Sequence, residues 1–202
     1  MSDFLQSVIE YKYLWGILLV LIALAVFMWV KASKALKLHN QKFQADLQKA
    51  ERNKMLFDRY SGCNLAEISD DAADDIIEGF AIIAEKNMDD ATDLNAAFVC
   101  LSTNEKYAYA AKYFFEDSEE GTSKFFRGST HPLTDTFMAV VQLADKNAYD
   151  ILVPVYEMTD ENNENVSFDE ALLKKYDEMY RSTIDTPTLK NKIKAVIIQN
   201  GN

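Results

Sequence analysis

The stretch YLWGILLVLIALAVFMWV, residues 13–30, decides the fold of this 202-residue chain, because it contains no charged residue and no Asn, Gln, Ser or Thr. As an α-helix it would be about 27 Å long, close to the ~30 Å hydrocarbon core of a bilayer. Trp15 and Trp29 stand near its two ends, where aromatic side chains favour the membrane interfaces. We therefore expect residues 13–30 to form a single transmembrane helix.

Two alternatives to a membrane span are a buried helix of a soluble protein and a cleaved signal peptide. A buried soluble helix is rarely so long and so uniformly apolar. A signal peptide has a basic leading segment and a shorter apolar core. The leading segment here contains Asp3 and Glu10 against Lys12, which favours an uncleaved anchor.

Lysine and arginine are unevenly distributed around this segment. Residues 1–12 contain only Lys12, whereas residues 31–54 contain six lysines and one arginine, beginning with Lys31, Lys34 and Lys37. Basic residues concentrate on the cytoplasmic side of a membrane and interact there with anionic head groups. We expect a single-pass protein of the bacterial inner membrane, with residues 1–12 outside and the C-terminal part in the cytoplasm.

Residues 31–60 are expected to continue the helix as a basic stalk. An apolar stripe recurs every seven residues, at Leu36, Phe43, Ala50 and Phe57. The positions three residues later are mostly polar, which weakens a coiled-coil seam: His39, Asp46, Asn53 and Tyr60. The stripe therefore has two interpretations: a homo-oligomer formed through the stalk, or, as we favour, a helix that packs one edge on the domain that follows.

Residues 61–202 are the predicted cytoplasmic domain, and their charge is the main clue to function. The whole chain has a formal charge of −11, but residues 55–202 contain 28 acidic side chains against 13 lysines and arginines. The residues predicted to bind a partner form two clusters: Asp70, Asp71, Asp74, Asp75 and Glu78, then Glu116, Asp117, Glu119 and Glu120. A third cluster is Asp160, Glu161, Glu164, Asp169 and Glu170. Such clusters are either ordinary solvated surface or an anionic face that fits a basic protein.

Apolar residues at helical spacing predict that the domain is all-α. Period-2 strands are absent from the pattern, and only 6 Gly and 3 Pro are present. A loop is expected around Gly121 and Gly128, and a polar loop over residues 159–166. The predicted helix starts are Ser69, Thr92, Pro132, Asn147, Ser167 with Glu170 as a capping box, and Thr186 with Pro187.

Catalytic and metal-binding motifs are not apparent. Two His and two Cys are too few for a zinc cluster or a disulfide framework, and no phosphate-binding glycine loop is present. Cys100 and His131 could form a nucleophilic dyad, but Cys100 lies on an apolar helical stretch and is expected to be a buried thiol. We expect no enzyme, no cofactor and no metal, and the acidic charge disfavours direct nucleic-acid binding.

The region from Leu94 to about Tyr180 resembles a bacterial family of small, acidic, all-helical DNA-mimic proteins. The family signature is roughly Asn-Gly-Gly-Phe-x-Gln-Phe-Phe-x-Asn, and this chain has EEGTSKFFRG at residues 119–128. Gly121, Phe125 and Phe126 match it, while the other signature positions differ. The resemblance implies protein binding by imitation of duplex DNA, often against DNA-binding regulators.

The sequence thus predicts a membrane-anchored acidic interaction module that binds a basic protein, which could itself bind nucleic acid. The alternative is a membrane-tethered scaffold or accessory subunit that contacts its partners through apolar helix surfaces.

Overall fold

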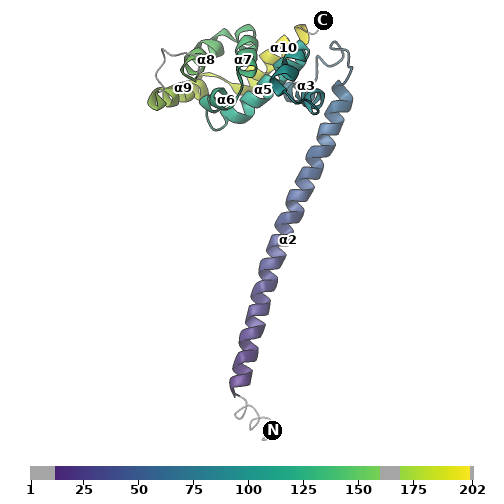
Figure 1. Cartoon of the computed structure of the whole chain (residues 1–202), viewed down its shortest axis with the longest axis vertical. Coiled ribbons are helices and arrows are strands. Elements are labelled where there is room, and N and C mark those ends of the chain that lie inside the picture. Colours follow the sequence, from purple (N-terminus) through teal and green to yellow (C-terminus); the bar gives the residue numbers. More distant parts are fainter. Residues whose placement is uncertain (1–11, 160–168, 201–202) are drawn as a thin grey trace. The chain divides into compact units, whose positions relative to one another are not determined.

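The computed structural model describes residues 12–159 and 169–200 (Figure 1). These residues form helices joined by turns and short loops, and no strand occurs among them. The prediction of an all-α chain with one long apolar helix near the N-terminus is therefore confirmed.

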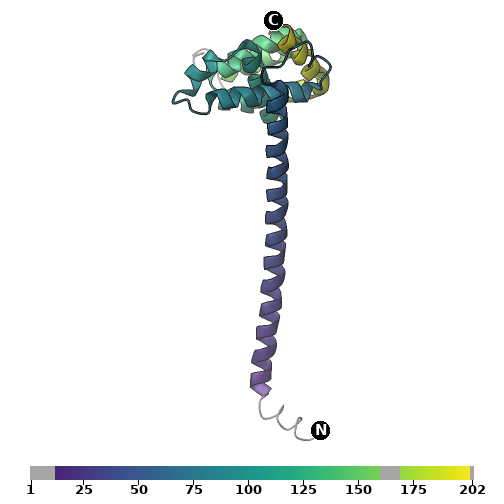
Figure 2. The same cartoon turned by 90° about the vertical axis from the view of Figure 1, so that its right-hand side faces the viewer.

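Helix α2, Lys12–Tyr60, is 49 residues long and runs without a break in both views (Figures 1 and 2). Its part from Gly16 onward is long and apolar enough to cross a membrane, with a window of mean hydropathy 2.3 that has no buried residue. Trp29 is 72% exposed, and the stripe residues Leu36 and Phe43 are exposed as well. An exposed apolar surface of this length needs lipid or another chain to cover it.

The chain divides into two compact units, Met1–Arg52 and Asn53–Asn202. The second unit therefore begins at Asn53 rather than at residue 61, the boundary that the sequence predicts. The difference arises because Leu56 and Tyr60, in the last turns of α2, are each only 2% exposed. The Tyr60 ring lies 5.9 Å from that of Phe80, which makes these turns part of the core.

Eight further helices follow α2 in the described residues. They are α3 (Ala73–Met88), α4 (Leu94–Cys100), α5 (Thr103–Ser118), α6 (Thr122–Gly128), α7 (His131–Ala144), α8 (Lys146–Thr159), α9 (Glu170–Thr183) and α10 (Thr186–Gln199). Helix α5 is central, because it packs on α3, α6, α7 and α10. It contributes Phe114 to the aromatic core and, at its C-terminal end, Glu116 and Asp117 to the second acidic cluster.

The core is built around Phe114 of α5. Its ring stacks on Phe137 of α7, with 3.9 Å between centroids, and meets Phe125 of α6 edge-on at 5.5 Å. Tyr180 of α9 approaches the same ring edge-on at 5.7 Å. Phe125 and Phe126 are buried, as apolar residues in a helical pattern are expected to be, rather than exposed as contact residues.

Aspartates cap several helices for which the sequence predicts a different capping residue nearby. Asp93, not Thr92, caps α4, and its Oδ1 accepts the amides of Asn95 and Ala96. Asp145, not Asn147, accepts the amides that open α8. A carboxylate also faces the positive end of the helix dipole, which a neutral side chain does not exploit. Asp169 caps α9, whereas the predicted cap Ser167 lies outside the described residues.

The start of α3 differs from the prediction, while that of α10 agrees with it. Helix α3 begins at Ala73, and the hydroxyl of Ser69 donates to the carbonyl of Ala66 instead of capping it. Helix α10 opens at Thr186 with Pro187 in its first turn, as predicted, and Asp185 caps it. Pro154 lies inside α8, which continues to Thr159.

The loop expected between Gly121 and Gly128 is instead helix α6. Its N-terminal amide, on Thr122, donates to Asp177 Oδ1 of α9 at 2.8 Å. Gly121 has φ +146°, and a Cβ there would lie 2.8 Å from Asp177 Oδ2. The cap thus comes from a residue distant in sequence, which local pattern could not reveal.

Replacing Gly79 with alanine should destabilise the second unit, because the new Cβ would lie 2.1 Å from the Tyr60 ring. Overpacking of this kind costs about 1–3 kcal/mol. The thermal midpoint of the full chain in detergent, followed by tyrosine near-UV circular dichroism, measures the loss. Gly128→Ala is the matched control, since nothing lies within 4 Å of a Cβ at that position. Equal midpoints for the two variants would contradict the packing of Tyr60 on Gly79.

Candidate functional site

The predicted partner-binding residues lie on two helices that pack together. Asp74, Asp75 and Glu78 lie on α3, with Asp70 and Asp71 just before it. Glu116 and Asp117 lie on α5, and Glu119 and Glu120 follow it. Asp74, Glu78 and Glu116 line the same hollow, of about 200 Å³, together with Lys112 and Lys190. The fold therefore brings parts of both acidic clusters to one place.

Asp71 is a structural residue of this group. Arg59 donates to both of its carboxylate oxygens at 3.2 Å, and the Tyr60 hydroxyl donates to it at 2.9 Å. These hydrogen bonds, first that of Arg59, hold the pKa of Asp71 below its ordinary value. Asp71 therefore fixes the end of α2 against the loop before α3.

Three other predicted residues are held by lysines. Lys190 of α10 binds Asp74 at 2.7 Å. Lys124 of α6 binds Asp117 at 3.2 Å and Glu120 at 2.9 Å. By contrast, the side chains of Asp70, Glu116 and Glu119 are exposed and form no ion pair within the described residues. The acidic surface thus combines anchored and unanchored carboxylates.

Helix α10 supplies lysines that the sequence alone does not identify as parts of this site. Lys192 binds Asp145 at 2.7 Å, and Lys194 donates to the backbone carbonyl of Asp71 at 2.7 Å. Together with Lys190, they tie the last helix to α3 and to the start of α8. The alternation of Lys190, Lys192 and Lys194 is visible in the sequence. Their partners are not, because each partner lies far away along the chain.

The predicted anchor residues lie on α2. The side chains of Trp29, Lys31, Lys34 and Lys37 are exposed, and the Lys31 ammonium lies 5.4 Å from the centroid of the Phe27 ring. The side chain of Trp15 is outside the described part. Of the third acidic cluster, Asp160, Glu161 and Glu164 also lie outside it, while Asp169 and Glu170 open α9.

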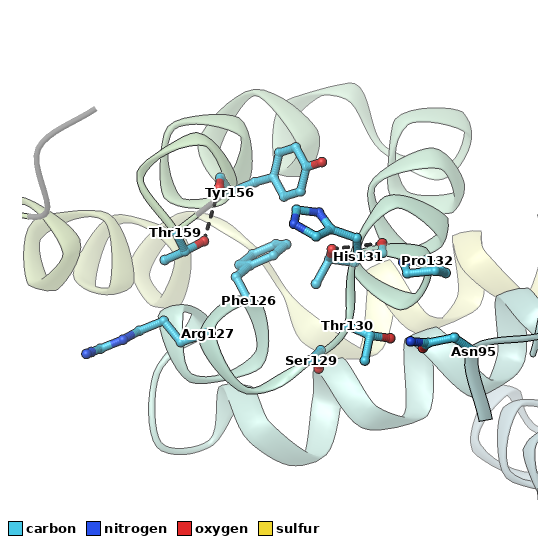
Figure 3. A pocket seen from close by; sticks show the side chains of 10 residues that line it. Asn95, Phe126, Arg127, Ser129, Thr130, His131, Pro132, Tyr156 and Thr159 are labelled. Atoms are coloured by element: carbon cyan, nitrogen blue, oxygen red, sulfur yellow. Dashed lines mark hydrogen bonds between the residues drawn. The ribbon is translucent and has the colours of Figure 1, made fainter. Parts of the chain in front are cut away.

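A polar hollow of about 330 Å³ lies where α6, α7 and α8 approach one another (Figure 3). His131 and Phe126 point toward one another across it, while Arg127 extends away from them. Its polar groups have local partners: Tyr156 donates to Asp135 at 2.5 Å, and Thr159 donates to the carbonyls of Val155 and Tyr156. These groups can hold a small polar molecule but include no cysteine or serine–histidine–carboxylate array.

Cys100 is exposed, so the expectation of a buried thiol is wrong. Helix α4 has only seven residues, and Phe98 alone is buried; Cys100, two positions later, faces a different side. Cys100 is not among the residues that line the hollow around His131. Within the described residues, no group of three His, Cys, Asp or Glu side chains is placed to hold a metal ion.

No protein-family model, no curated protein and no solved structure matches this chain. The three residues that match the DNA-mimic signature have roles in the fold. Gly121 precedes α6 with a positive φ, and Phe125 and Phe126 fill the core. These positions account for the shape of α6 and do not by themselves indicate a binding surface.

Acid should weaken the second unit through Asp71 and Asp145. Lys192 is the main cause of the lowered pKa of Asp145, as Arg59 is for Asp71. A carboxyl with a folded-state pKa below its ordinary value of about 3.9 stabilises the fold above that value. This contribution is lost as the pH falls through the folded-state pKa.

Asp145→Asn retains a side-chain cap but loses the charge, and should destabilise the protein by roughly 1–2 kcal/mol at neutral pH. The difference in stability between this variant and the unmodified chain should shrink below about pH 4, because Asp145 then becomes protonated and loses its charge. Thermal midpoints measured across this range test the effect, with the exposed Asp150→Asn as control. A difference that stays constant with pH would contradict the ion pair.

Proposed function

We propose that this protein is a membrane-anchored acidic interaction module. The apolar half of α2 crosses the bilayer, and the helical domain binds a basic protein through carboxylates of α3 and of the end of α5. The observation that carries the proposal is the excess of 28 acidic over 13 basic side chains in residues 55–202, with Asp74, Glu78 and Glu116 around one hollow. Carboxylates gathered on one surface attract a basic protein and increase the rate at which it associates with this domain.

The paired and unpaired carboxylates have different parts in this proposal. Asp70, Glu116 and Glu119 are exposed and ready to meet a cation of the partner. Asp117 and Glu120 share Lys124 at the surface, where an ion pair is worth only about 0–1 kcal/mol and can exchange partners. Asp71 is excluded from the contact, because its loss would release Arg59 and Tyr60.

The partner is a protein whose basic groove accepts negative charge, as nucleic-acid-binding proteins do. A row of carboxylates can replace phosphates in such a groove, and binding then gains from the release of counterions, as it does with DNA. The support for this class of partner is the charge of the domain, because the three residues that match the DNA-mimic signature serve the fold.

A scaffold that binds through apolar surfaces is the second candidate. Leu94, Val99 and Leu143 favour it, because they are 65, 58 and 61% exposed. Such a contact would resist salt, whereas a contact between exposed charges is screened over about 8 Å at physiological ionic strength.

Neutralising Asp70, Glu116 and Glu119 to Asn or Gln should weaken capture of a basic partner by about tenfold, at roughly 0.5 kcal/mol for each exposed charge pair. The full chain captures partners from a bacterial extract, mass spectrometry identifies them, and affinity is then measured with the purified partner. The matched control removes the same charge from α8 and α9, with Asp150→Asn, Glu157→Gln and Glu178→Gln. Equal affinity for both triple variants, unchanged from about 0.1 M to about 1 M salt, would favour the scaffold instead.

We propose that the domain lies in the cytoplasm of a bacterial cell, with the first residues outside the inner membrane, and the distribution of Lys and Arg supports this orientation. Alkaline phosphatase, which is active only outside the cytoplasm, should be inactive when fused after Asn202. A fluorescent protein fused at the same place should be bright. Active phosphatase at that position would reverse the proposed orientation.

A further inference from the structure

A groove of about 410 Å³ lies beside the second acidic cluster, between α4, α5 and the start of α7. Its floor is apolar and aromatic, and consists of Met88, Phe98, Tyr109, Tyr113 and Leu133. Glu116 and Asp117 line one rim, and Leu94 lines an edge. We call this feature the acid-rimmed groove.

The floor is built on a small core of its own. Met88, Phe98 and Leu101 are buried together, apart from the main aromatic core, and Tyr109 and Leu133 pack against them. The rings of Tyr109 and Phe98 lie 5.8 Å apart, and those of Tyr109 and Tyr113 lie 4.6 Å apart. The floor is therefore held by packing before any ligand arrives.

The edge of the groove leaves apolar surface uncovered. Phe98 is the only buried residue of the seven-residue helix α4, while Leu94 of the same helix is 65% exposed. An occupant that only filled the hollow would leave Leu94 in water. One that extends along α4 would cover it, as a peptide segment can.

The charge of the rim decides what kind of segment fits. Glu116 is exposed and forms no ion pair in the described part of the chain, and Asp117 shares Lys124 with Glu120. Asp89 and Asp90 follow the floor residue Met88 and are exposed. Lys112, the cation nearest in sequence to the floor tyrosines, is held by Glu85 at 2.6 Å. Apolar side chains on the floor and cationic side chains at the rim are thus the complementary arrangement.

We propose that the acid-rimmed groove binds an amphipathic basic helix of the partner. Its apolar face lies on Phe98, Tyr109 and Leu94, and a lysine or arginine reaches Glu116. Apolar contact supplies most of the affinity, and the rim sets orientation and encounter rate. This inference rests on the proposed function, because it assumes a basic protein partner, and adds where and by which face that partner binds.

The test uses the full chain in nanodiscs of zwitterionic lipid, with empty nanodiscs as blank. The probe is a fluorescein-labelled peptide of leucine and lysine whose leucines recur at helical spacing. A shuffled peptide of the same composition has no apolar face, and a leucine–glutamate peptide reverses the charge. Fluorescence anisotropy gives the affinities.

Leu94→Ser should weaken binding of the leucine–lysine helix by about tenfold, because it removes a large apolar contact. Val99→Ser is the matched control: Val99 is 58% exposed on the same helix but does not line the groove, so its loss should change affinity less than about twofold. Both positions are exposed, so the circular dichroism spectrum should stay unchanged. Glu116→Gln should lower affinity at low salt more than Glu119→Gln does.

Four outcomes overturn the inference. Equal losses at Leu94 and Val99, or no binding of the leucine–lysine helix, would remove the groove as its site. The shuffled peptide could also bind as well as the helix and lose that binding when Asp70, Glu116 and Glu119 are neutralised. This result would show that the groove is not the binding site, while the proposed function would stand. Equal binding of the leucine–glutamate peptide would overturn the groove and the proposed function together.

Discussion

The Phe114 ring, stacked on Phe137 at 3.9 Å between centroids, is the contact on which the arrangement of the domain depends. Both rings are fully buried, and Phe114 also meets aromatic rings of α6 and α9. Aromatic pairs add about 0.5–1.5 kcal/mol to the burial of their area and prefer defined geometries. They therefore fix the rotation of α5 about its axis as well as its position. Because Glu116 and Asp117 lie two and three positions after Phe114 on α5, the same contact determines which way their carboxylates face.

The distribution of positive charge explains how so acidic a domain stays compact. Repulsion among like charges destabilises a compact state. Lys190 and Lys192 oppose it by binding Asp74 and Asp145, and Lys124 binds Asp117 in the last turn of α5 and Glu120 just after it. Lys190 and Lys192 reach carboxylates far from them in sequence, so these two ion pairs hold helices together as well as reducing the repulsion. Among the described residues, Asp70, Glu116 and Glu119 are exposed and take no part in these ion pairs.

The long helix α2 has a different surface chemistry in its first part and in its last turns. Its first part is apolar around its whole circumference, with Trp29 and Phe27 exposed. Its last turns bury Leu56 and Tyr60 in the domain, where Gly79 leaves room for the Tyr60 ring. Arg59 and Asp71 hold these turns from the outside. These last turns of α2 are therefore a packed part of the second unit.

The sequence by itself determined the helical class and the apolar span of residues 13–30, because each is a local pattern of hydrophobicity. It also located α10 through Thr186 and Pro187. Only the tertiary structure decided that α6 exists, since its cap is Asp177, and that the domain begins at Asn53, since Tyr60 needs Gly79. It likewise decided which carboxylates are paired, because Lys190 and Asp74 are brought together by folding. Contacts between residues far apart in sequence leave no periodic signal, so an acidic cluster is visible in the sequence while its neutralisation is not.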